Sequence, residues 1–261
     1  MKICLAQTRI WFEEKEKNLW LAERLVRKAA GKGAELILFP EMSFTGFSMN
    51  TGLTGEKHAE TSERMLKLAS ENGLNIGFGW VEKSRNGCLN HYSVTGADGR
   101  IRADYAKIHP FSFSGEDRYF RGGDRLCVFE MDGIRMALFI CYDLRFPELF
   151  RAVCEAVSVI ITPANWPAKR SEHWKTLLRA RAIENQVYIL GVNCQGDMNG
   201  QYYSGDSCIF DPNGDLKDSL SDREGMIFYD LEDDVERFRA AFPVLKDRRK
   251  ELYQGFNSEK K

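Results

Sequence analysis

The sequence lacks the paired cysteines of a disulfide framework or a structural zinc site. Its seven cysteines are an odd number, are widely scattered and include no Cys-x-x-Cys pair. Both a disulfide-stabilised scaffold and a zinc-ribbon type of site are therefore disfavoured. We expect most of these cysteines to be reduced and to pack as small hydrophobic side chains in the interior.

The sequence also lacks an excess of either charge and a long hydrophobic run. Lys+Arg 37 against Asp+Glu 38 gives a formal net charge of -1, so no global field attracts nucleic acid or an anionic membrane surface. The longest apolar runs, such as residues 135–146, are too short to cross a bilayer, and acidic residues stand near the N-terminus where a signal peptide would have its cleavage site. We expect a cytoplasmic protein.

No low-complexity segment, internal repeat or cluster of proline and glycine divides the chain. Its 261 residues, with 43% hydrophobic and 29% charged, are typical of a globular protein near the upper size of one α/β domain. We predict a single domain over residues 1–261. The last twenty or so residues are highly charged, and they form either a solvated tail or an arm that docks on a partner subunit.

Hydrophobic periodicity predicts strands and helices that alternate along the chain. Gly31 and Gly73 are predicted to end two of the helices, and Ser62 is a candidate N-cap. Turn dipeptides at Asp98-Gly99 and Asp132-Gly133, with a third turn at 211–214, predict antiparallel hairpins, so the sheets should be mixed. The predicted strands are 2–7, 35–40, 75–83, 135–143, 158–164 and 187–193, and the predicted helices are about 19–29, 62–73, 146–157 and 172–185.

Three residues with reactive side chains follow predicted strands: Glu41, Lys107 and Cys141. In α/β folds, sites form in the loops beyond the carboxyl ends of strands. Cleavage of an amide needs a nucleophile, a group that accepts its proton, and donors that stabilise the negatively charged oxygen of the tetrahedral intermediate. A thiol, a carboxylate and an ammonium group meet these three needs.

Cys141 is expected at a sharp transition from strand to helix, with Pro147 in the first turn of the helix. Backbone N–H groups and the positive end of the helix dipole would then face the thiol and favour the thiolate. Taken singly, however, a cysteine at the end of an apolar strand is more often part of the core, and a glutamate or lysine is more often solvated. Periodicity alone does not bring Glu41, Lys107 and Cys141 together.

Three blocks of the sequence resemble those that carry the Glu-Lys-Cys triad of the nitrilase superfamily of carbon-nitrogen hydrolases, in the same order. They are FPEMSFTGF (39–47), YAKIHPF (105–111) and ICYDLRFPELFR (140–151). Residues 163–193 and 202–214 resemble the C-terminal blocks of that superfamily, most closely those of its omega-amidase branch. The resemblance covers nearly the whole chain, which makes it more specific than an isolated short motif.

The resemblance implies a four-layer α-β-β-α sandwich with two mixed sheets, a homodimer, and catalysis without a metal or organic cofactor. Glu41 would take the proton of the Cys141 thiol, and Cys141 would attack the amide carbonyl. Lys107 and the backbone N–H of Tyr142 would stabilise the oxyanion. Ammonia would leave, and water activated by Glu41 would hydrolyse the thioester. The implied substrates are small dicarboxylate monoamides, such as 2-oxoglutaramate or 2-oxosuccinamate.

The superfamily also has a second glutamate after the lysine, and Glu116 stands at a comparable place. The adjacent Asp117 could point inward instead, and the segment could also be a solvated acidic loop. Arg145 is the candidate for binding the substrate carboxylate, because guanidinium groups bind carboxylates with two parallel hydrogen bonds. The alternative is an internal ion pair of Arg145 with Asp143 or Glu148.

Asn165 and Trp166 follow a predicted strand, so Asn165 could donate a hydrogen bond to the substrate and Trp166 could wall a small pocket, although an aromatic there is often simple packing. The helix with residues 179–185 is interpreted as structural. A cysteine-histidine mechanism would need His109 or His173 beside the thiol, and neither has the sequence context of such an enzyme.

Two other functions remain open at the level of the sequence. One is a different amidase specificity within the superfamily, towards deaminated glutathione or an N-carbamoyl compound. The other is a catalytically silent scaffold of the same fold, which would be recognised by loss of a triad residue. All three triad candidates are present.

Overall fold

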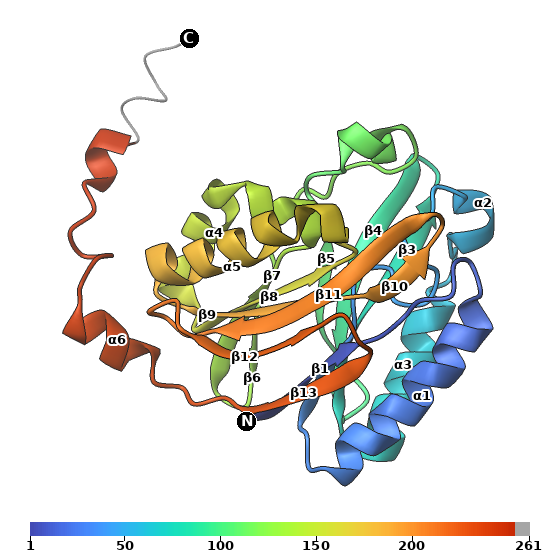
Figure 1. The fold of residues 1–261 in the computed structure, drawn as a ribbon, viewed down its shortest axis with the longest axis horizontal. Coiled ribbons are helices and arrows are strands. Elements are labelled where there is room, and N and C mark those ends of the chain that lie inside the picture. The colour runs from blue at the N-terminus through green and yellow to red at the C-terminus, as the bar shows by residue number, and fades with distance from the viewer. Residues whose placement is uncertain (254–261) are drawn as a thin grey trace.

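The computed structural model describes residues 1–253, in which two mixed β-sheets pack face to face and helices cover the outer face of each sheet (Figure 1). Helices α1 (Lys15–Gly31) and α3 (Glu60–Asn72) lie on one side, and α4 (Pro147–Val153) and α5 (Ser171–Asn185) lie on the other. The predicted four-layer α-β-β-α arrangement is confirmed.

Within the described residues, the first sheet has six strands in the order β13-β1-β2-β3-β4-β5. Strands β1, β2 and β3 are parallel, and the other pairs are antiparallel. In β1, Ile3 and Leu5 pack between the two sheets, whereas Cys4 and Ala6 pack beneath the helices, as the two-residue period of a strand requires. The strands are β1 (Lys2–Gln7), β2 (Leu36–Leu38), β3 (Asn75–Ser84), β4 (Gly87–Thr95), β5 (Ile101–Ala106) and β13 (Gly225–Asp230).

The second sheet has seven strands in the described part of the chain, in the order β10-β11-β9-β8-β7-β6 with β12 paired to β11. Its centre is parallel, β7-β8-β9, and reads as continuous apolar sequence because both faces are buried. The strands are β6 (Val128–Met131), β7 (Ile134–Leu138), β8 (Val159–Ala164), β9 (Tyr188–Asn193), β10 (Gln195–Met198), β11 (Gln201–Phe210) and β12 (Leu216–Ser221).

Short helical elements join these strands, and several of them surround the carboxyl ends of β5, β7 and β8. They are α2 (Thr51–Thr54) and the 3-10 turns η1 (Ser112–Ser114), η2 (Glu116–Arg118), η3 (Cys141–Arg145), η4 (Cys154–Ala156) and η5 (Ala168–Arg170). A further short helix, α6 (Val235–Ala241), follows β13.

The predicted turns form hairpins, and one predicted helix cap is wrong. Asp98-Gly99 joins β4 to β5, Asp132-Gly133 joins β6 to β7, and residues 211–214 join β11 to β12, all antiparallel. Ser62 does not cap α3, because the helix begins at Glu60 and buries Ser62 in its first turn. The helix ends before Gly73, whose φ of 60° is the left-handed conformation expected of such a glycine.

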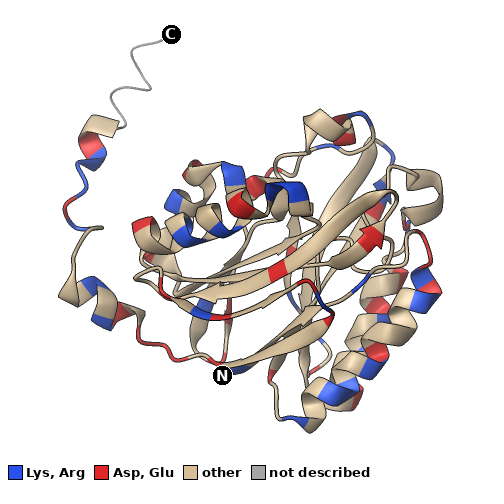
Figure 2. Cartoon of the chain, in the orientation of Figure 1, with Lys and Arg blue, Asp and Glu red and all other residues tan. Residues whose placement is uncertain are grey.

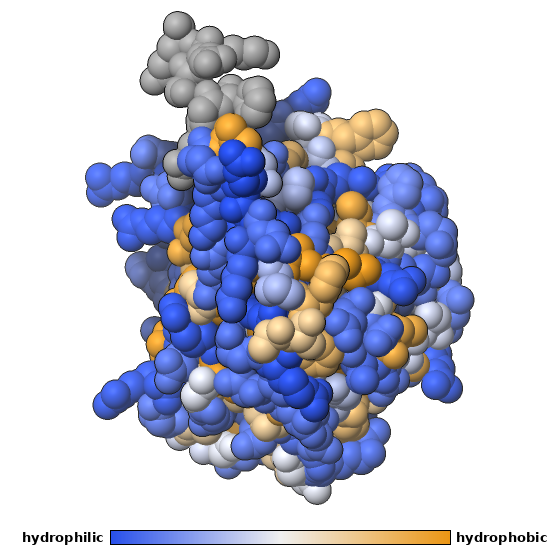
Figure 3. Space-filling model, turned by 90° about the vertical axis from the view of Figure 1, so that its left-hand side faces the viewer, coloured by the Kyte–Doolittle hydropathy of each residue, from blue (hydrophilic) through white to orange (hydrophobic). Residues whose placement is uncertain are grey.

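After β13 the chain passes through α6 and runs away from the body of the protein (Figure 1). Arg239 of α6 donates to the carbonyl oxygens of Cys154 and Val157, at 2.7 and 2.9 Å. Figure 3 shows that the face bearing this segment is mainly hydrophilic, with apolar side chains between the charged ones. The part of the predicted arm or tail beyond Tyr253 lies outside the described residues.

Charges of both signs are interspersed over the molecule, most densely on the outer faces of α1 and α3 (Figure 2). Ion pairs join these two helices: Arg64 of α3 contacts Glu16 and Glu23 of α1, at 2.7 and 2.8 Å. Among the described helices, none is long and apolar enough to cross a membrane.

Candidate active site

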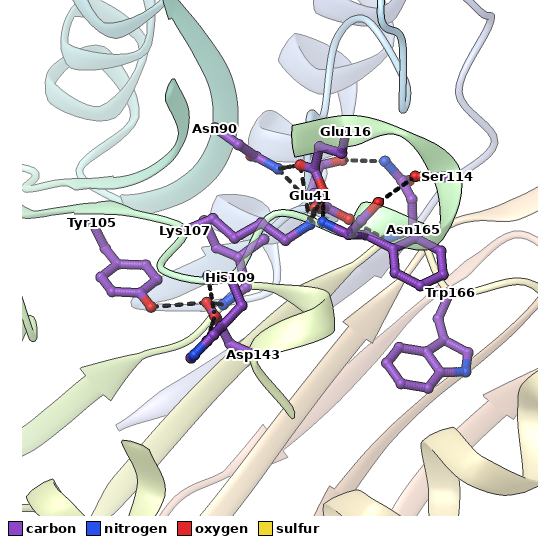
Figure 4. A network of polar contacts seen from close by, with 12 residues as sticks. Glu41, Asn90, Tyr105, Lys107, His109, Ser114, Glu116, Asp143, Asn165 and Trp166 are labelled. Atoms are coloured by element: carbon purple, nitrogen blue, oxygen red, sulfur yellow. Dashed lines mark hydrogen bonds and ion pairs between the residues drawn. The ribbon is translucent and has the colours of Figure 1, made fainter. Parts of the chain in front are cut away.

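Glu41, Lys107 and Glu116 meet in a buried charge cluster (Figure 4). The Lys107 Nζ lies 2.9 Å from Glu41 Oε1 and 2.9 Å from Glu116 Oε2. The three side chains are at most 1% exposed, so water screens these charges little. Phe39 and Pro40 separate Glu41 from the end of β2, and Lys107 directly follows β5. Both residues therefore follow strands, as the sequence predicts.

Of the two candidates for the second acidic residue, Glu116 is the one that lies in this cluster. Glu116 is fully buried and accepts hydrogen bonds from Lys107 and from the backbone N–H of Phe111, the latter at 2.6 Å. Asp117 is exposed. Asn90 of β4 joins the two glutamates, because its Nδ2 lies 2.8 Å from Glu41 Oε1 and 3.2 Å from Glu116 Oε1. Asn90 is a site residue that the sequence analysis did not identify.

Lys107 is held in its charged form with one donor to spare. Burial disfavours the charge, but Glu116 and Glu41 outweigh this effect and raise the pKa of Lys107 above its ordinary value. An ammonium group has three N–H donors. In the described residues Lys107 Nζ makes one hydrogen bond to Glu41 Oε1, at 2.9 Å, and two to the same Glu116 carboxyl group, at 3.2 and 2.9 Å. Because one N–H can be shared between the two Glu116 oxygens, one donor can serve Glu41 and another a group in the cavity that Lys107 lines.

Cys141 lies at the predicted transition from strand to helix, but its surroundings disfavour the thiolate. The residue follows β7, begins η3 and has a φ of 46°, a left-handed conformation that is rare for a residue with a Cβ. Burial, followed by the nearby charge of Glu41, raises the pKa of the thiol well above its ordinary value and outweighs the opposite effect of Lys107. This direction is opposite to the one expected from the helix start, because burial and two carboxyl groups outweigh the short helical turn.

Asp143 connects two segments, the turn that contains Cys141 and the segment that contains Lys107. Its carboxyl group accepts hydrogen bonds from the Ile140 backbone N–H at 3.1 Å, the Tyr105 hydroxyl at 2.8 Å and the His109 backbone N–H at 2.9 Å. Tyr105 and His109 stand two residues on either side of Lys107. Figure 4 shows Asp143 beside Tyr105 and His109. The buried carboxyl group thus sets the position of the thiol relative to the lysine.

Asn165 fixes Glu41 across the two sheets. The residue follows β8, its backbone N–H donates to Glu41 Oε2 at 2.9 Å, and its Nδ2 donates to the Glu41 carbonyl oxygen at 3.0 Å. Asn165 lines the cavity, but these two donors are directed at Glu41 instead of a substrate. Gly79 lets the Glu41–Met42 backbone pass closely, because a Cβ at this position would lie 2.2 Å from the Met42 nitrogen.

A cavity of about 250 Å³ opens above the thiol and lies next to the charge cluster. Arg145 does not pair with Asp143 or Glu148: its guanidinium carbon lies 4.8 Å from the Trp166 ring centroid, and the side chain faces the cavity. The internal ion pair considered for Arg145 is therefore absent from the described residues. The cavity is lined by Phe47, Lys107, Phe111, Phe113, Ser114, Cys141, Tyr142, Arg145, Asn165, Trp166, Pro167, Lys169, Arg170, Met198, Asn199, Gln201 and Tyr203.

Trp166 and Tyr142 wall this cavity, Trp166 as expected. The Trp166 backbone N–H donates to Asn193 Oδ1 at 2.8 Å, and the Trp166 indole N–H donates to the Arg170 carbonyl oxygen at 2.8 Å. The Tyr142 ring packs against Phe111, with 4.7 Å between ring centroids. One wall is therefore a rigid aromatic surface.

A family model described as carbon-nitrogen hydrolase matches residues 2–240. The chain belongs to the carbon-nitrogen hydrolase family. A Bacillus subtilis protein named 2-oxoglutaramate amidase is 33% identical over 256 residues, which cover 96% of this chain and 98% of that protein. The Xenopus tropicalis protein named omega-amidase NIT2 is 30% identical, with 92% of each chain covered.

Solved structures of the family agree. A crystal structure of XC1258 from Xanthomonas campestris, described as a CN-hydrolase superfamily protein with an arsenic adduct in the active site, has a TM-score of 0.90 and 29% identity, with 95% of this chain and 97% of that chain covered. The predicted superfamily, fold and enzyme class, an amidase, are thereby confirmed.

In this carbon-nitrogen hydrolase, His109 and His173 make their contacts with residues other than Cys141. The His109 Nδ1 lies 2.8 Å from Asp143 Oδ1, and the imidazole stacks on Phe146 with 3.7 Å between ring centroids. His173 lies beside Arg145, with 3.3 Å between Nδ1 and Nη2. In residues 1–253, neither imidazole makes a hydrogen bond to Cys141, so the geometry does not support a cysteine-histidine pair.

The arginines of α5 are structural, as interpreted from the sequence. Arg181 donates to the Leu144 carbonyl oxygen at 2.8 Å and pairs with Glu184 at 3.0 Å, and Arg179 donates to the Gly214 carbonyl oxygen at 2.9 Å. The hydrogen bond of Arg181 to Leu144 thereby stabilises η3.

Proposed function

We propose that this carbon-nitrogen hydrolase is an omega-amidase, which removes ammonia from small monoamides of dicarboxylic acids such as 2-oxoglutaramate. The observation that carries the proposal is Arg145, which has no acidic partner among the described residues and shares one small cavity with Cys141 and Lys107. Such a cavity offers a nucleophile at one end and a carboxylate-binding cation at the other. The names of the Bacillus subtilis and Xenopus tropicalis relatives support the same class of substrate.

The first half of the reaction forms a thioester. Because the thiol is neutral at rest, it must lose its proton during attack, and Glu41 is the carboxyl group whose charge acts most strongly on it. The Cys141 Sγ bonds to the amide carbon, and the oxyanion is stabilised by the third N–H of Lys107 and by the Tyr142 backbone N–H. The C–N bond then breaks, Glu41 returns the proton to the nitrogen, and ammonia leaves.

The second half hydrolyses the thioester. Glu41 takes a proton from water, and the resulting hydroxide adds to the carbonyl carbon. The C–S bond then breaks and Glu41 returns the proton to the Cys141 sulfur, which gives the carboxylic acid and the free thiol. Asn165 and Asn90 hold Glu41 in place through both halves, at 2.9 and 2.8 Å from its two carboxyl oxygens. Glu116 acts through Lys107, which it holds at 2.9 Å, as a positioning residue.

Arg145 would bind the carboxylate of the substrate. Burial, followed by the nearby charge of Arg170, lowers the pKa of Arg145, so a carboxylate bound to Arg145 offsets this unfavourable environment. The cavity of about 250 Å³ is below the usual size of ligand pockets, which favours a small amide over a tripeptide derivative such as deaminated glutathione.

Ammonia release from a panel of amides tests this proposal. The panel holds 2-oxoglutaramate, 2-oxosuccinamate, succinamate, deaminated glutathione and an N-carbamoyl amino acid, with the Cys141→Ala variant as the blank. We expect turnover of the first three. Turnover of deaminated glutathione alone, or carbon dioxide released with ammonia from the carbamoyl compound alone, would assign another amidase specificity. No turnover of any amide would favour a silent scaffold.

We also propose a homodimer and a cytoplasmic location. Large apolar side chains are exposed at the C-terminal segment, where Phe242 is 69% and Tyr253 is 51% exposed, which fits a surface that a second copy covers. Light scattering on the purified protein should give twice the chain mass; a monomer mass would remove the dimer. All seven cysteines are free, which fits a reducing compartment, and cell fractionation tests this location.

A further inference from the structure

The cavity holds more hydrogen-bond donors than one carboxylate needs. Besides Arg145 and the donors near the thiol, Arg170 of η5 and Tyr203 of β11 line it. Neither side chain has a role in the reaction described above. Both are donors that the sequence analysis did not identify.

Tyr203 presents a hydroxyl group without a protein partner to the cavity. The residue is 5% exposed and lines the cavity, and within residues 1–253 its hydroxyl makes no hydrogen bond. Burial, followed by the proximity of Cys194, Cys141 and Glu41, raises the pKa of Tyr203, so the hydroxyl keeps its proton and can donate. Because no described residue accepts this O–H, a ligand oxygen in the cavity can serve as its acceptor.

Arg170 brings a second guanidinium group to the same cavity. Its guanidinium carbon lies 5.4 Å from the Phe111 ring centroid, and it forms no ion pair with a described residue. Its backbone is fixed, because the Arg170 carbonyl oxygen accepts the Trp166 indole N–H at 2.8 Å. An arginine packed on an aromatic ring without an acidic partner is suited to bind an anionic or carbonyl oxygen.

The segments that carry these two residues are joined by a single buried carboxyl group. Asp206 accepts a hydrogen bond from the Ser171 hydroxyl at 2.7 Å and another from the Ser204 hydroxyl. Ser171 follows Arg170, and Ser204 follows Tyr203. Asp206 therefore fixes η5 against β11 and places the two donors on one side of the cavity in a set register.

We propose that Arg170 and Tyr203 form an oxygen-binding subsite beside Arg145, which takes the 2-oxo group of the substrate and selects 2-oxo acid amides over plain dicarboxylate monoamides. This proposal rests on the proposed function. A 2-oxo carboxylate carries a carbonyl oxygen next to its carboxylate, and both accept hydrogen bonds only. The two guanidinium groups offer donors only and the protonated Tyr203 hydroxyl has one O–H to donate, so the chemistry is complementary.

The ratio of kcat/KM for 2-oxosuccinamate to that for succinamate measures the subsite, because these two amides differ only in the 2-oxo oxygen. We expect the unmodified enzyme to favour 2-oxosuccinamate by at least about tenfold. Tyr203→Phe and Arg170→Met should each lower kcat/KM for 2-oxosuccinamate by about tenfold to a hundredfold, mainly through KM, and change that for succinamate by less than about threefold.

Two control variants separate this subsite from general effects. Tyr202→Phe removes the neighbouring hydroxyl, which is bonded to Asp222 and lies outside the cavity lining, and should leave the ratio unchanged. Lys169→Gln removes another cation from the cavity lining and should lower kcat/KM for both amides by the same factor. Equal thermal midpoints of the variants exclude a loss of folding.

Binding of 2-oxoglutarate and glutarate, measured by calorimetry, tests the subsite without turnover. We expect tighter binding of 2-oxoglutarate by the unmodified enzyme, and loss of that difference in Tyr203→Phe. Equal effects of Tyr203→Phe and Arg170→Met on both members of each pair would overturn the subsite. An enzyme that hydrolyses no amide but still binds 2-oxoglutarate selectively would refute the proposed function and keep the subsite.

Discussion

The two ends of the cavity differ in how their charges are satisfied. At the base of the cavity, which is the buried charge cluster, Lys107 lies between Glu41 and Glu116, with 2.9 Å to a carboxyl oxygen of each. At the wall, Arg145 and Arg170 have aromatic rings beneath them and no acidic partner among the described residues. The charge of Lys107 is paired with carboxyl groups without a ligand, whereas Arg145 and Arg170 gain an anionic partner when a ligand binds.

This difference separates the chemistry from the recognition. A charge cluster with fixed internal hydrogen bonds needs little rearrangement when an oxyanion develops. This preorganisation supplies most of the rate enhancement of such sites. A wall with unpaired donors binds ligands but contributes little to folding. Substitutions at the base should therefore change rate and stability together, and substitutions at the wall should change substrate affinity alone.

The largest effect should come from the nucleophile. Cys141→Ala removes the only atom that can form the thioester, and ammonia release should fall by a factor of about 10⁴ or more. Cys154→Ala is the matched control, since Cys154 is fully buried and lies outside the cavity lining. Comparable losses in the two variants would mean that the cysteines act through folding.

Disrupting the charge cluster at the base of the cavity should lower both the reaction rate and the stability of the fold. Lys107→Met leaves two buried carboxyl groups without their cation, and we expect a loss of about 3–5 kcal/mol in the free energy of unfolding. Activity should fall by a factor of about 10² to 10³ because an oxyanion donor is lost. Urea denaturation and ammonia assays measure the two effects; a variant with unchanged stability would show that the cluster is not needed for folding.

Breaking the wall should leave stability intact. Arg145→Met keeps the stacking on Trp166 but removes the guanidinium group, and KM for carboxylated amides should rise by about tenfold to a hundredfold. The free energy of unfolding should change by less than about 0.5 kcal/mol. An uncharged amide such as butyramide serves as the control, and an equal rise in its KM would refute a role in carboxylate binding.

The smallest effect concerns the state of the thiol. Because burial and Glu41 raise the pKa of Cys141 well above 9.0, the fraction of thiolate at any given pH is lower than in an ordinary cysteine. Reaction with methyl methanethiosulfonate should therefore keep rising with pH through 9.0, at a rate at least about tenfold below that of free cysteine at pH 8. A plateau below pH 8 would indicate a thiolate instead.

The sequence was sufficient for the parts of the site that follow strands. Glu41, Lys107 and Cys141 were identified because they come after apolar runs within blocks that resemble those of a known superfamily. The choice between Glu116 and Asp117 was not accessible, since adjacent residues differ only in which one the turn η2 directs inward. The direction of the thiol pKa was not accessible either, because a helix start can be recognised in a sequence, whereas burial among carboxyl groups cannot.

Residues that act from within strands were missed. Asn90 and Tyr203 stand in β4 and β11, where an alternating pattern gives no sign that one side chain faces a cavity. Asp143 was considered only as a partner for Arg145, although it connects the nucleophile turn to Tyr105 and His109. The signal in the sequence that could have pointed to Asp143 is an acidic residue two positions after the predicted nucleophile, within the same block.

The most direct test of the account is the mass of the enzyme during turnover. Rapid acid quench of the enzyme with 2-oxoglutaramate, followed by peptide mass spectrometry, should show an adduct on Cys141 equal to the mass of the substrate minus ammonia, and this adduct should be absent from Cys141→Ala. Ammonia release with an unmodified Cys141, or with the adduct on another residue, would contradict the account.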